Sequence, residues 1–326
     1  MTGIFKGNNP SGNAILFFYA IVLKLPLLLH LHAPRLQPAD GVLYKSFLQL
    51  TDSISRTFPY FYSLLTFILL FTQAVSFNNI VNNQRLHKLP NYLTGMSYLL
   101  ITSLFSEWFS LSAPLIVSSF ILWIWAKLCT LYNNPDPKAT IFNIGLLTGI
   151  AVFFYFPSIA FLLLVTAGIA ISRPFKLQEW LIGLVGIIMP AYFFATWLFL
   201  TSHKIDIHFP LLRFFSPHFL GNRWFYAALA MLTFALGLGL YFISKRMNRQ
   251  VVQTRKSWQL LFFYIIIAAV VTFFNTGFNL SNWILPALPL SAVMASAFLY
   301  PDKWVYPAIL HWGMFIIYLA VGFFSK

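Results

Sequence analysis

The sequence predicts an all-α fold, a polytopic transmembrane helical bundle of about 11 spans, with 10 to 12 compatible with its apolar segments. Hydrophobic residues make up 59% of the chain and charged residues 9%, whereas soluble domains carry about 25% charged residues. Residues 141–171 contain no charge at all. Lipid forces backbone groups to pair within each segment, and the alternating segments of about ten residues typical of a transmembrane barrel do not occur. We therefore expect one integral membrane domain over residues 1–326.

The first expected span covers residues 14–31, which Lys24 and Pro26 interrupt. It is too long for the apolar part of a cleavable signal peptide, so we expect it to be retained. The following loop is too polar to span, but it carries an apolar stripe at helical spacing, which predicts an amphipathic helix on the membrane surface. The stripe is Leu43, Phe47, Leu50 and Ile54.

The stretch 141–171 is too long for one crossing of about 20 residues and short for two. Pro157, at its midpoint, removes a backbone donor and disfavours helix at Phe156. We therefore expect two short helices that meet in a bend at residues 155–157. In the first, Gly145 and Gly149 form a small-xxx-small packing face. The other expected spans are residues 59–77, 92–105, 112–131, 181–200, 224–244, 258–274, 283–300 and 305–324.

The net charge of +14 is explained by orientation in a membrane, so no nucleic-acid partner is expected; the lipid bilayer is. Loop 245–256 is the most basic segment, and basic loops stay in the cytoplasm. This predicts a multi-pass protein of the inner (cytoplasmic) membrane with a cytoplasmic N-terminus. The single Cys129 excludes an internal disulfide. Four of the seven acidic residues then fall on the outer side: Asp40, Asp52, Glu107 and Asp206.

Asp40 and Glu107 lie in the first and second outer loops. Two neighbouring carboxylates can bind a divalent cation or act as a general base towards an acceptor group, so these are the candidate catalytic residues. The alternative is structural. Asp40 is then the cap of the surface helix that begins at Gly41, and Glu107 is a solvated turn residue.

The outer loop after residue 200 offers two further candidate sites. His203, Asp206 and His208 are potential metal ligands, although their spacing matches no zinc pattern, and a loop that dips into the interface explains them equally well. Cations near aromatic residues suit the phosphate and isoprenoid chain of a lipid carrier, or they anchor the loop to lipid headgroups. The candidate substrate-binding residues are Lys204, Arg213, His218 and Arg223.

Asn275, Asn279 and Asn282 can hydrogen-bond a ligand, or they cap a turn, as Gly277 and Ser281 suggest. Nucleotide-binding loops, CxxC pairs and serine nucleophile elbows are missing from the sequence.

Segments 145–165 and 285–300 resemble parts of C-type (GT-C fold) glycosyltransferases, which use lipid-linked sugars. That resemblance implies a catalytic Asp after the first span, where Asp40 stands, and a second acid in the second outer loop, where Glu107 stands. The chain departs from the family in having no Asp-Glu pair in its first loop.

The whole chain also resembles an uncharacterised family of integral membrane proteins from Bacteroidota, a domain of unknown function. The resemblance rests on Phe5-Lys6-Gly7-Asn8-Asn9-Pro10 and on the Arg-Pro-Phe-x-x-x-Glu-Trp segment from Arg173 to Trp180. It implies a bacterial membrane and no particular activity.

Three functions remain open on the sequence. The first is a transferase that takes a group from an isoprenoid-phosphate donor on the outer leaflet, with Asp40 as base or metal ligand and Glu107 as its helper. The second is a non-catalytic subunit or scaffold of a cell-envelope assembly, with membrane-protein partners. The third is a transporter or flippase, for which only Lys24 and Lys127 are charged residues within apolar segments.

Overall fold

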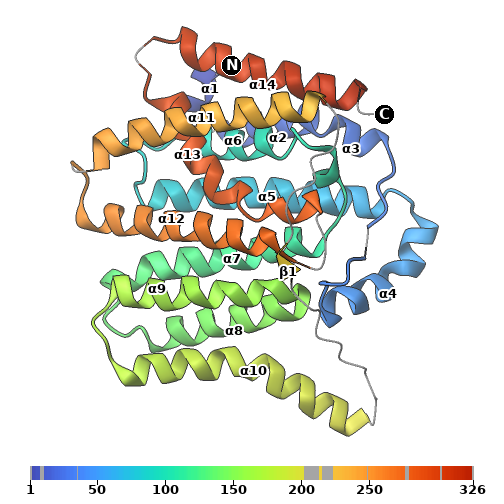
Figure 1. Cartoon of the computed structure of the whole chain (residues 1–326), viewed down its shortest axis with the longest axis vertical. Helices are drawn as coiled ribbons and strands as arrows, with labels where there is room; N and C mark the ends of the chain where they lie inside the picture. Colours follow the sequence, from blue (N-terminus) through green and yellow to red (C-terminus); the bar gives the residue numbers. More distant parts are fainter. Residues whose placement is uncertain are drawn as a thin grey trace.

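The computed structural model of the chain describes residues 2–7, 11–34, 36–201, 213–214, 223–247, 249–275, 279–301 and 303–324. These residues are helical apart from connecting loops and one two-residue antiparallel pair. The longer helices lie side by side between two ends of the molecule, and the chain passes back and forth between these ends (Figure 1). The elements are α1 (Thr2–Lys6), α2 (Gly12–Leu23), α3 (Leu25–Leu29), α4 (Val42–Thr57), α5 (Phe61–Asn83), α6 (Leu93–Ile101), η1 (Ser106–Phe109), α7 (Ala113–Thr130), η2 (Leu131–Asn133), α8 (Lys138–Phe154), η3 (Phe156–Phe161), α9 (Leu162–Ser172), α10 (Leu177–Thr201), β1 (Arg213–Phe214), α11 (Arg223–Met247), α12 (Val252–Phe273), β2 (Phe274–Asn275), η4 (Leu280–Ile284), α13 (Ala287–Leu299) and α14 (Val305–Phe324).

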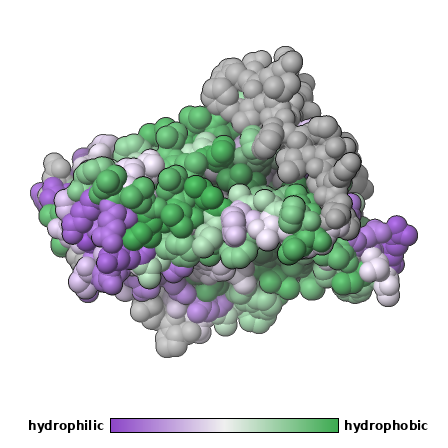
Figure 2. Space-filling model, turned by 90° about the horizontal axis from the view of Figure 1, so that it is seen from below, coloured by the Kyte–Doolittle hydropathy of each residue, from purple (hydrophilic) through white to green (hydrophobic). Residues whose placement is uncertain are grey.

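Five of these helices, α5, α7, α10, α11 and α12, are long and apolar enough to cross a membrane. Figure 2 shows apolar residues over the middle of one face and hydrophilic residues gathered towards its two ends, as expected for a protein surrounded by lipid. The chain is therefore an all-helical protein with the character of a membrane protein. The count of about 11 spans and the C-type fold stay predictions, because α2, α8, α9 and α13 have fewer than 18 residues, as does the part of α14 over residues 305–321 whose side chains are described.

Two short helices occupy the centre of the bundle. Every residue of α6 is buried, and α13 packs against it with all but two of its residues buried. Because protein rather than lipid surrounds α6, nine residues are enough for it. Its N-terminal end is held by polar side chains: the Asn78 and Asn82 amides donate to the Asn91 carbonyl at 3.0 and 2.9 Å, and Gly95 N donates to Asn78 Oδ1 at 3.2 Å.

The predicted bend near Pro157 is confirmed. Helix α8 ends at Phe154, Tyr155 is extended, and η3 and α9 continue the chain to Ser172. The backbone groups freed by the break are satisfied by the loop before α4: Gly41 N donates to Phe154 O at 2.9 Å and Phe156 N to Ala39 O at 3.1 Å. A side chain at residue 41 would collide with the Phe153 carbonyl, so the close approach requires glycine there.

Helix α4 forms where the apolar stripe predicts an amphipathic helix. Its inner face is fixed to the bundle by Tyr44, whose buried hydroxyl donates to Leu111 O at 3.0 Å. Leu43, Leu50 and Ile54 of the stripe remain exposed, Leu50 by 78%. An exposed apolar stripe beside polar residues is what a helix at a membrane surface presents to lipid.

Helices α8 and α10 approach closely through glycines, as the small-xxx-small face predicts. A β-carbon at Gly145 would meet the Gly183 carbonyl oxygen, and one at Gly149 the Ile187 carbonyl oxygen. The other faces of α10 are largely exposed: only 11% of its most apolar 18-residue stretch is buried in the protein.

Candidate functional site

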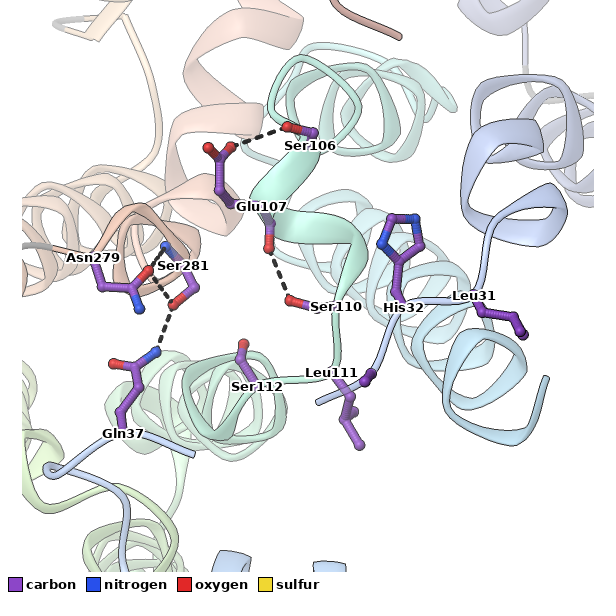
Figure 3. A pocket seen from close by; sticks show the side chains of 11 residues that line it. Leu31, His32, Gln37, Ser106, Glu107, Ser110, Leu111, Ser112, Asn279 and Ser281 are labelled. Carbon is purple, nitrogen blue, oxygen red and sulfur yellow. Dashed lines mark hydrogen bonds between the residues drawn. The ribbon is translucent and has the colours of Figure 1, made fainter. Parts of the chain in front are cut away.

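A cavity of about 400 Å³ lies at the end of the bundle where the loop between α3 and α4 meets η1 and η4. We call it the polar cavity, because eight of its eleven lining residues have polar side chains (Figure 3). Its volume is within the range of about 300–1,000 Å³ that small-molecule sites occupy. Its lining residues come from three loops that are distant in the sequence: Leu31, His32, Ala33 and Gln37; Ser106, Glu107, Ser110, Leu111 and Ser112; and Asn279 and Ser281.

Glu107 lies on the wall of the polar cavity, half-buried in the 3-10 helix η1. The hydroxyl of Ser106 donates to its carboxylate over a long 3.4 Å, and Ser110 Oγ donates to its backbone carbonyl at 3.1 Å. In the part of the chain that the structure describes, no basic side chain forms an ion pair with Glu107. The carboxylate is thus held in place weakly and faces the cavity with acceptor capacity to spare.

A row of hydrogen-bonded polar side chains forms another part of the cavity wall (Figure 3). Gln37 Nε2 donates to Ser281 Oγ at 2.7 Å, and the Ser281 hydroxyl and amide donate to Asn279 Oδ1 at 3.0 and 3.1 Å. Asn279 is the N-cap of η4, so the expectation that it caps a turn is confirmed. Sequence analysis did not single out Gln37 and named Ser281 only as a turn residue, because isolated polar residues in loops carry no motif.

Asp40 is buried directly behind this row. It is 5% exposed, its Oδ2 accepts from Gln37 N at 2.7 Å, and its Oδ1 has no hydrogen-bond partner among the described residues. Burial raises the pKa of this carboxyl to about 6, although the Gln37 amide and the nearby Lys45 oppose the rise. Asp40 does not line the polar cavity; it reaches the wall through Gln37, to whose backbone it is bonded.

The structural alternative for Asp40 is corrected in one respect. The residue at the N-cap of α4 is Gly41, and no side chain caps this helix. Asp40 instead closes the turn that begins at Gln37, because its own amide donates to Gln37 O at 3.0 Å. Its extended backbone pairs with Tyr155 at the bend between α8 and η3.

The other candidate residues are located only in part. The backbone of Arg213 pairs with Asn275 in the β1–β2 ladder, and Arg223 is the first residue of α11. Lys204 and His218 lie outside the described residues, as do the potential metal ligands His203, Asp206 and His208. Among the residues that are described, no three His, Cys, Asp or Glu side chains gather into a group that could hold a metal ion.

Lys24, the buried cation on which a transport function would depend, is fixed by neighbours. Its ammonium donates to Thr102 Oγ1 at 3.0 Å and lies 5.1 Å from the centre of the Phe109 ring. Thr102 lies at the start of the segment that carries Glu107, and Phe109 lies at its end. Lys24 therefore helps to hold that segment against α2.

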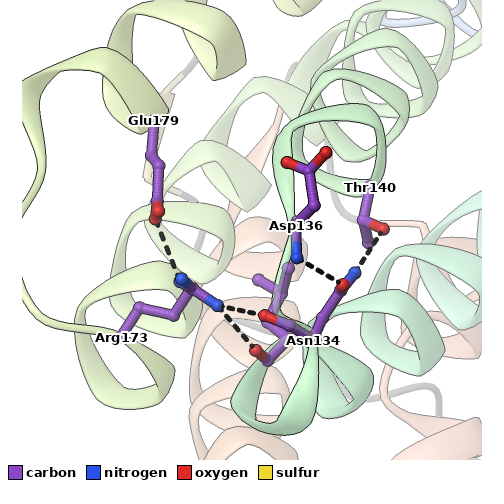
Figure 4. Close-up of polar contacts among 6 residues, drawn as sticks. Asn134, Asp136, Thr140, Arg173 and Glu179 are labelled. Carbon is purple, nitrogen blue, oxygen red and sulfur yellow. Dashed lines mark hydrogen bonds and ion pairs between the residues drawn. The ribbon is translucent and has the colours of Figure 1, made fainter.

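The polar cavity adjoins the N-terminal end of α7, and a second group of polar contacts lies at the C-terminal end of this helix (Figure 4). Arg173 Nε pairs with Glu179 Oε2 at 3.1 Å, and both side chains are largely buried. Arg173 Nη1 also donates to Asn134 O at 2.6 Å, which fixes the predicted turn at residues 133–137. The two buried charges of this group, Arg173 and Glu179, are paired with each other, so it is a structural joint rather than a binding site.

The model of one family, a family of unknown function (DUF6427), matches residues 41–326. The chain belongs to this family. The match includes Glu107, the Arg173–Glu179 ion pair and η4, and it begins one residue after Asp40. No curated protein and no solved structure matches the chain. Family membership therefore assigns no activity, and any function has to be argued from the geometry of the polar cavity.

Proposed function

We propose that this protein is a transferase of the inner membrane that takes a sugar or a related group from an isoprenoid-phosphate donor at the outer leaflet. The observation that supports the proposal best is the polar cavity, with the Glu107 carboxylate, which has no ion-pair partner among the described side chains, on its wall and the buried Asp40 behind it. Acids without an ion-pair partner in a concave site are typical of functional groups, whereas the buried Glu179 is paired with Arg173.

The geometry favours Glu107 as the group that meets the acceptor. An acceptor hydroxyl would give its proton to the Glu107 carboxylate while its oxygen bonds to the transferred carbon. The bond from that carbon to the donor phosphate breaks, and the isoprenoid phosphate leaves with the bonding electrons. Asp40 supports the wall through Gln37, and Arg213 and Arg223 would neutralise the leaving phosphate. A divalent cation at Glu107 is the other way to neutralise that charge.

The test is turnover of radiolabelled polyprenyl-phosphate sugars by the purified protein in nanodiscs, measured as released polyprenyl phosphate. We expect Glu107→Gln to lower the rate by about 10²–10⁴-fold, the usual contribution of a positioned general base. The matched control is Asp52→Asn, which removes an exposed carboxylate from α4, away from the cavity. The proposal fails if wild-type protein releases no polyprenyl phosphate from any donor, or if Glu107→Gln and Asp52→Asn turn over equally.

A scaffold in a membrane assembly is the second candidate, and the surface of α10 favours it. This helix packs mainly on α8 and leaves Tyr192, Phe193 and Trp197 exposed by 61%, 63% and 49%. Such a face can contact a partner helix as well as lipid. If α10 binds a partner, Phe193→Ala should remove a protein that otherwise copurifies from the native membrane without changing turnover.

A further inference from the structure

The short helices η1 and η4 form a wall with different residues on its two sides. Ser106 and Glu107 face the polar cavity, whereas their neighbours Phe105 and Trp108 line a second cavity of about 310 Å³. The same alternation occurs in η4, where Ser281 lines the polar cavity and Leu280 the second one. Trp108 Nε1 donates to Leu280 O at 2.8 Å and ties the two helices together. We call this structure the η1–η4 wall.

The second cavity, here called the apolar cavity, is lined by apolar side chains, most of them from α11, α12 and the start of α13 and the rest from α6 and the η1–η4 wall. They include Leu232 and Leu236 from α11, Ile265 and Ala269 from α12, and Pro286 and Leu290. Thr233, also in its lining, is exposed, so the cavity reaches the surface of the bundle along α11. Aromatic rings close the end of the apolar cavity at the wall. The ring centroids of Phe105 and Trp108 are 4.7 Å apart, and those of Phe273 and Trp283 are 5.1 Å apart.

Two arginines are located by their backbones at this same end. Arg213 pairs in the β1–β2 ladder with Asn275, two residues after Phe273, which lines the apolar cavity. Arg223 begins α11 two residues before Phe225, another lining residue. A hydrocarbon cavity and a polar cavity on the two sides of one wall match the hydrocarbon chain and the head group of a lipid phosphate, and the backbones of two arginines lie near the end where the wall stands.

We infer that the apolar cavity binds the hydrocarbon chain of a polyprenyl phosphate, with its phosphorylated head group beside Glu107 in the polar cavity and the chain crossing the rim of the η1–η4 wall. The inference rests on the proposed function, because that function supplies the donor. It adds the place where the chain lies.

The structure provides a matched pair of variants on one helix. Leu236 lines the apolar cavity, and Leu238, equally half-buried on α11, lines a different apolar cavity of about 420 Å³ between α11 and α14. That other cavity has no acidic or hydroxyl-bearing neighbour in its lining except Tyr306. Leu236→Trp and Leu238→Trp therefore add the same bulk and differ in which cavity they fill.

The experiment is photocrosslinking of a radiolabelled polyprenyl phosphate with a photoreactive group in its chain to the full-length protein in nanodiscs. We expect Leu236→Trp to reduce crosslinking about tenfold, equivalent to about 1.4 kcal/mol of binding, and Leu238→Trp to leave it unchanged. Ala269→Phe fills the same cavity from α12 and replaces Leu236→Trp if that variant does not fold. Peptide mapping should place the label on α11 or α12.

Equal crosslinking by the two tryptophan variants would overturn the inference. Failure of the proposed function gives a different pattern. If the protein binds the chain as inferred but is not a transferase, crosslinking responds to Leu236→Trp while no donor is turned over. If it is a transferase whose donor chain lies elsewhere, turnover persists in Leu236→Trp.

Discussion

The two ends of α7 hold acidic residues in opposite situations. At its C-terminal end, Glu179 is 6% exposed and paired with Arg173, which also binds two backbone carbonyls. At its N-terminal end, about 27 Å away for a helix of 18 residues, Glu107 and Asp40 have no ion-pair partner within the described residues. The first arrangement stabilises a turn. The second leaves acceptor oxygens unused beside a cavity, which is the situation that chemistry requires.

The largest expected effect of a single change concerns the paired acid. Glu179→Gln keeps the shape of the side chain but leaves the buried Arg173 charge without its counter-ion. Removing one partner of a buried pair costs about 3–5 kcal/mol of the free energy of unfolding. Reversible unfolding in mixed micelles should measure that loss, and turnover per folded molecule should stay near the wild-type value.

Arg173→Met provides the control for this comparison. It also removes the hydrogen bonds to Asn134 O and Leu131 O, so it should destabilise at least as much as Glu179→Gln. The double variant should lose less than the sum of the two single losses, because the second change no longer breaks a pair. Additive losses would show that the two side chains act independently.

The next effect is a pH dependence caused by Asp40. Its pKa is about 6 in the folded protein against 3.8 for the unperturbed group. A raised pKa means that the folded state binds more protons between these values, so the free energy of unfolding falls as pH rises from about 4 to about 6, by about 3 kcal/mol. Asp40→Asn should abolish this fall.

The quantity to measure is the difference in free energy of unfolding between wild type and Asp40→Asn at pH 4, 5, 6 and 7. All other titrating groups are common to both proteins and cancel in that difference. Relative to wild type, the variant should gain stability as pH rises and level off above about pH 6. A difference that does not change with pH would mean that Asp40 is not desolvated.

A smaller effect is expected at Gln37, which joins Asp40 to the wall of the polar cavity. Gln37 donates its side-chain amide to Ser281 and its backbone amide to Asp40. Gln37→Ala removes only the first bond, so a loss of about 1 kcal/mol is expected from unfolding measurements. Ser281→Ala, which breaks the same bond from the other side and the bond to Asn279 Oδ1, should cost somewhat more.

The sequence predicted much of the arrangement of these ends and little of their internal geometry. The bend at Pro157, the helix after Gly41 and the close packing at Gly145 were all predictable, because each follows from a local constraint on the backbone or from an apolar period. The burial of α6 was not, since a short apolar segment looks the same whether protein or lipid surrounds it.

The candidate site shows the same division. Asp40 and Glu107 could be singled out because acids are scarce in this chain. Asp40 is buried behind the wall of the polar cavity, whereas Glu107 lies in that wall. This difference depends on contacts between loops more than 60 residues apart in the sequence. The Gln37–Ser281 bond, which joins residues separated by 244 positions, has no local sequence signal.

The smallest change in the free energy of unfolding is expected for Glu107→Gln. This variant decides whether Glu107 differs from the structural acid Glu179. Glu107→Gln is the same substitution as Glu179→Gln, on a half-buried side chain whose only hydrogen bond to the carboxylate is a 3.4 Å contact from Ser106. No buried cation loses its partner within the described residues, so the free energy of unfolding should change by no more than about 0.5 kcal/mol. A loss comparable with that of Glu179→Gln would make Glu107 a structural acid. An unchanged stability, together with lost turnover, would mean that the acid is kept for a ligand and contributes nothing to the fold.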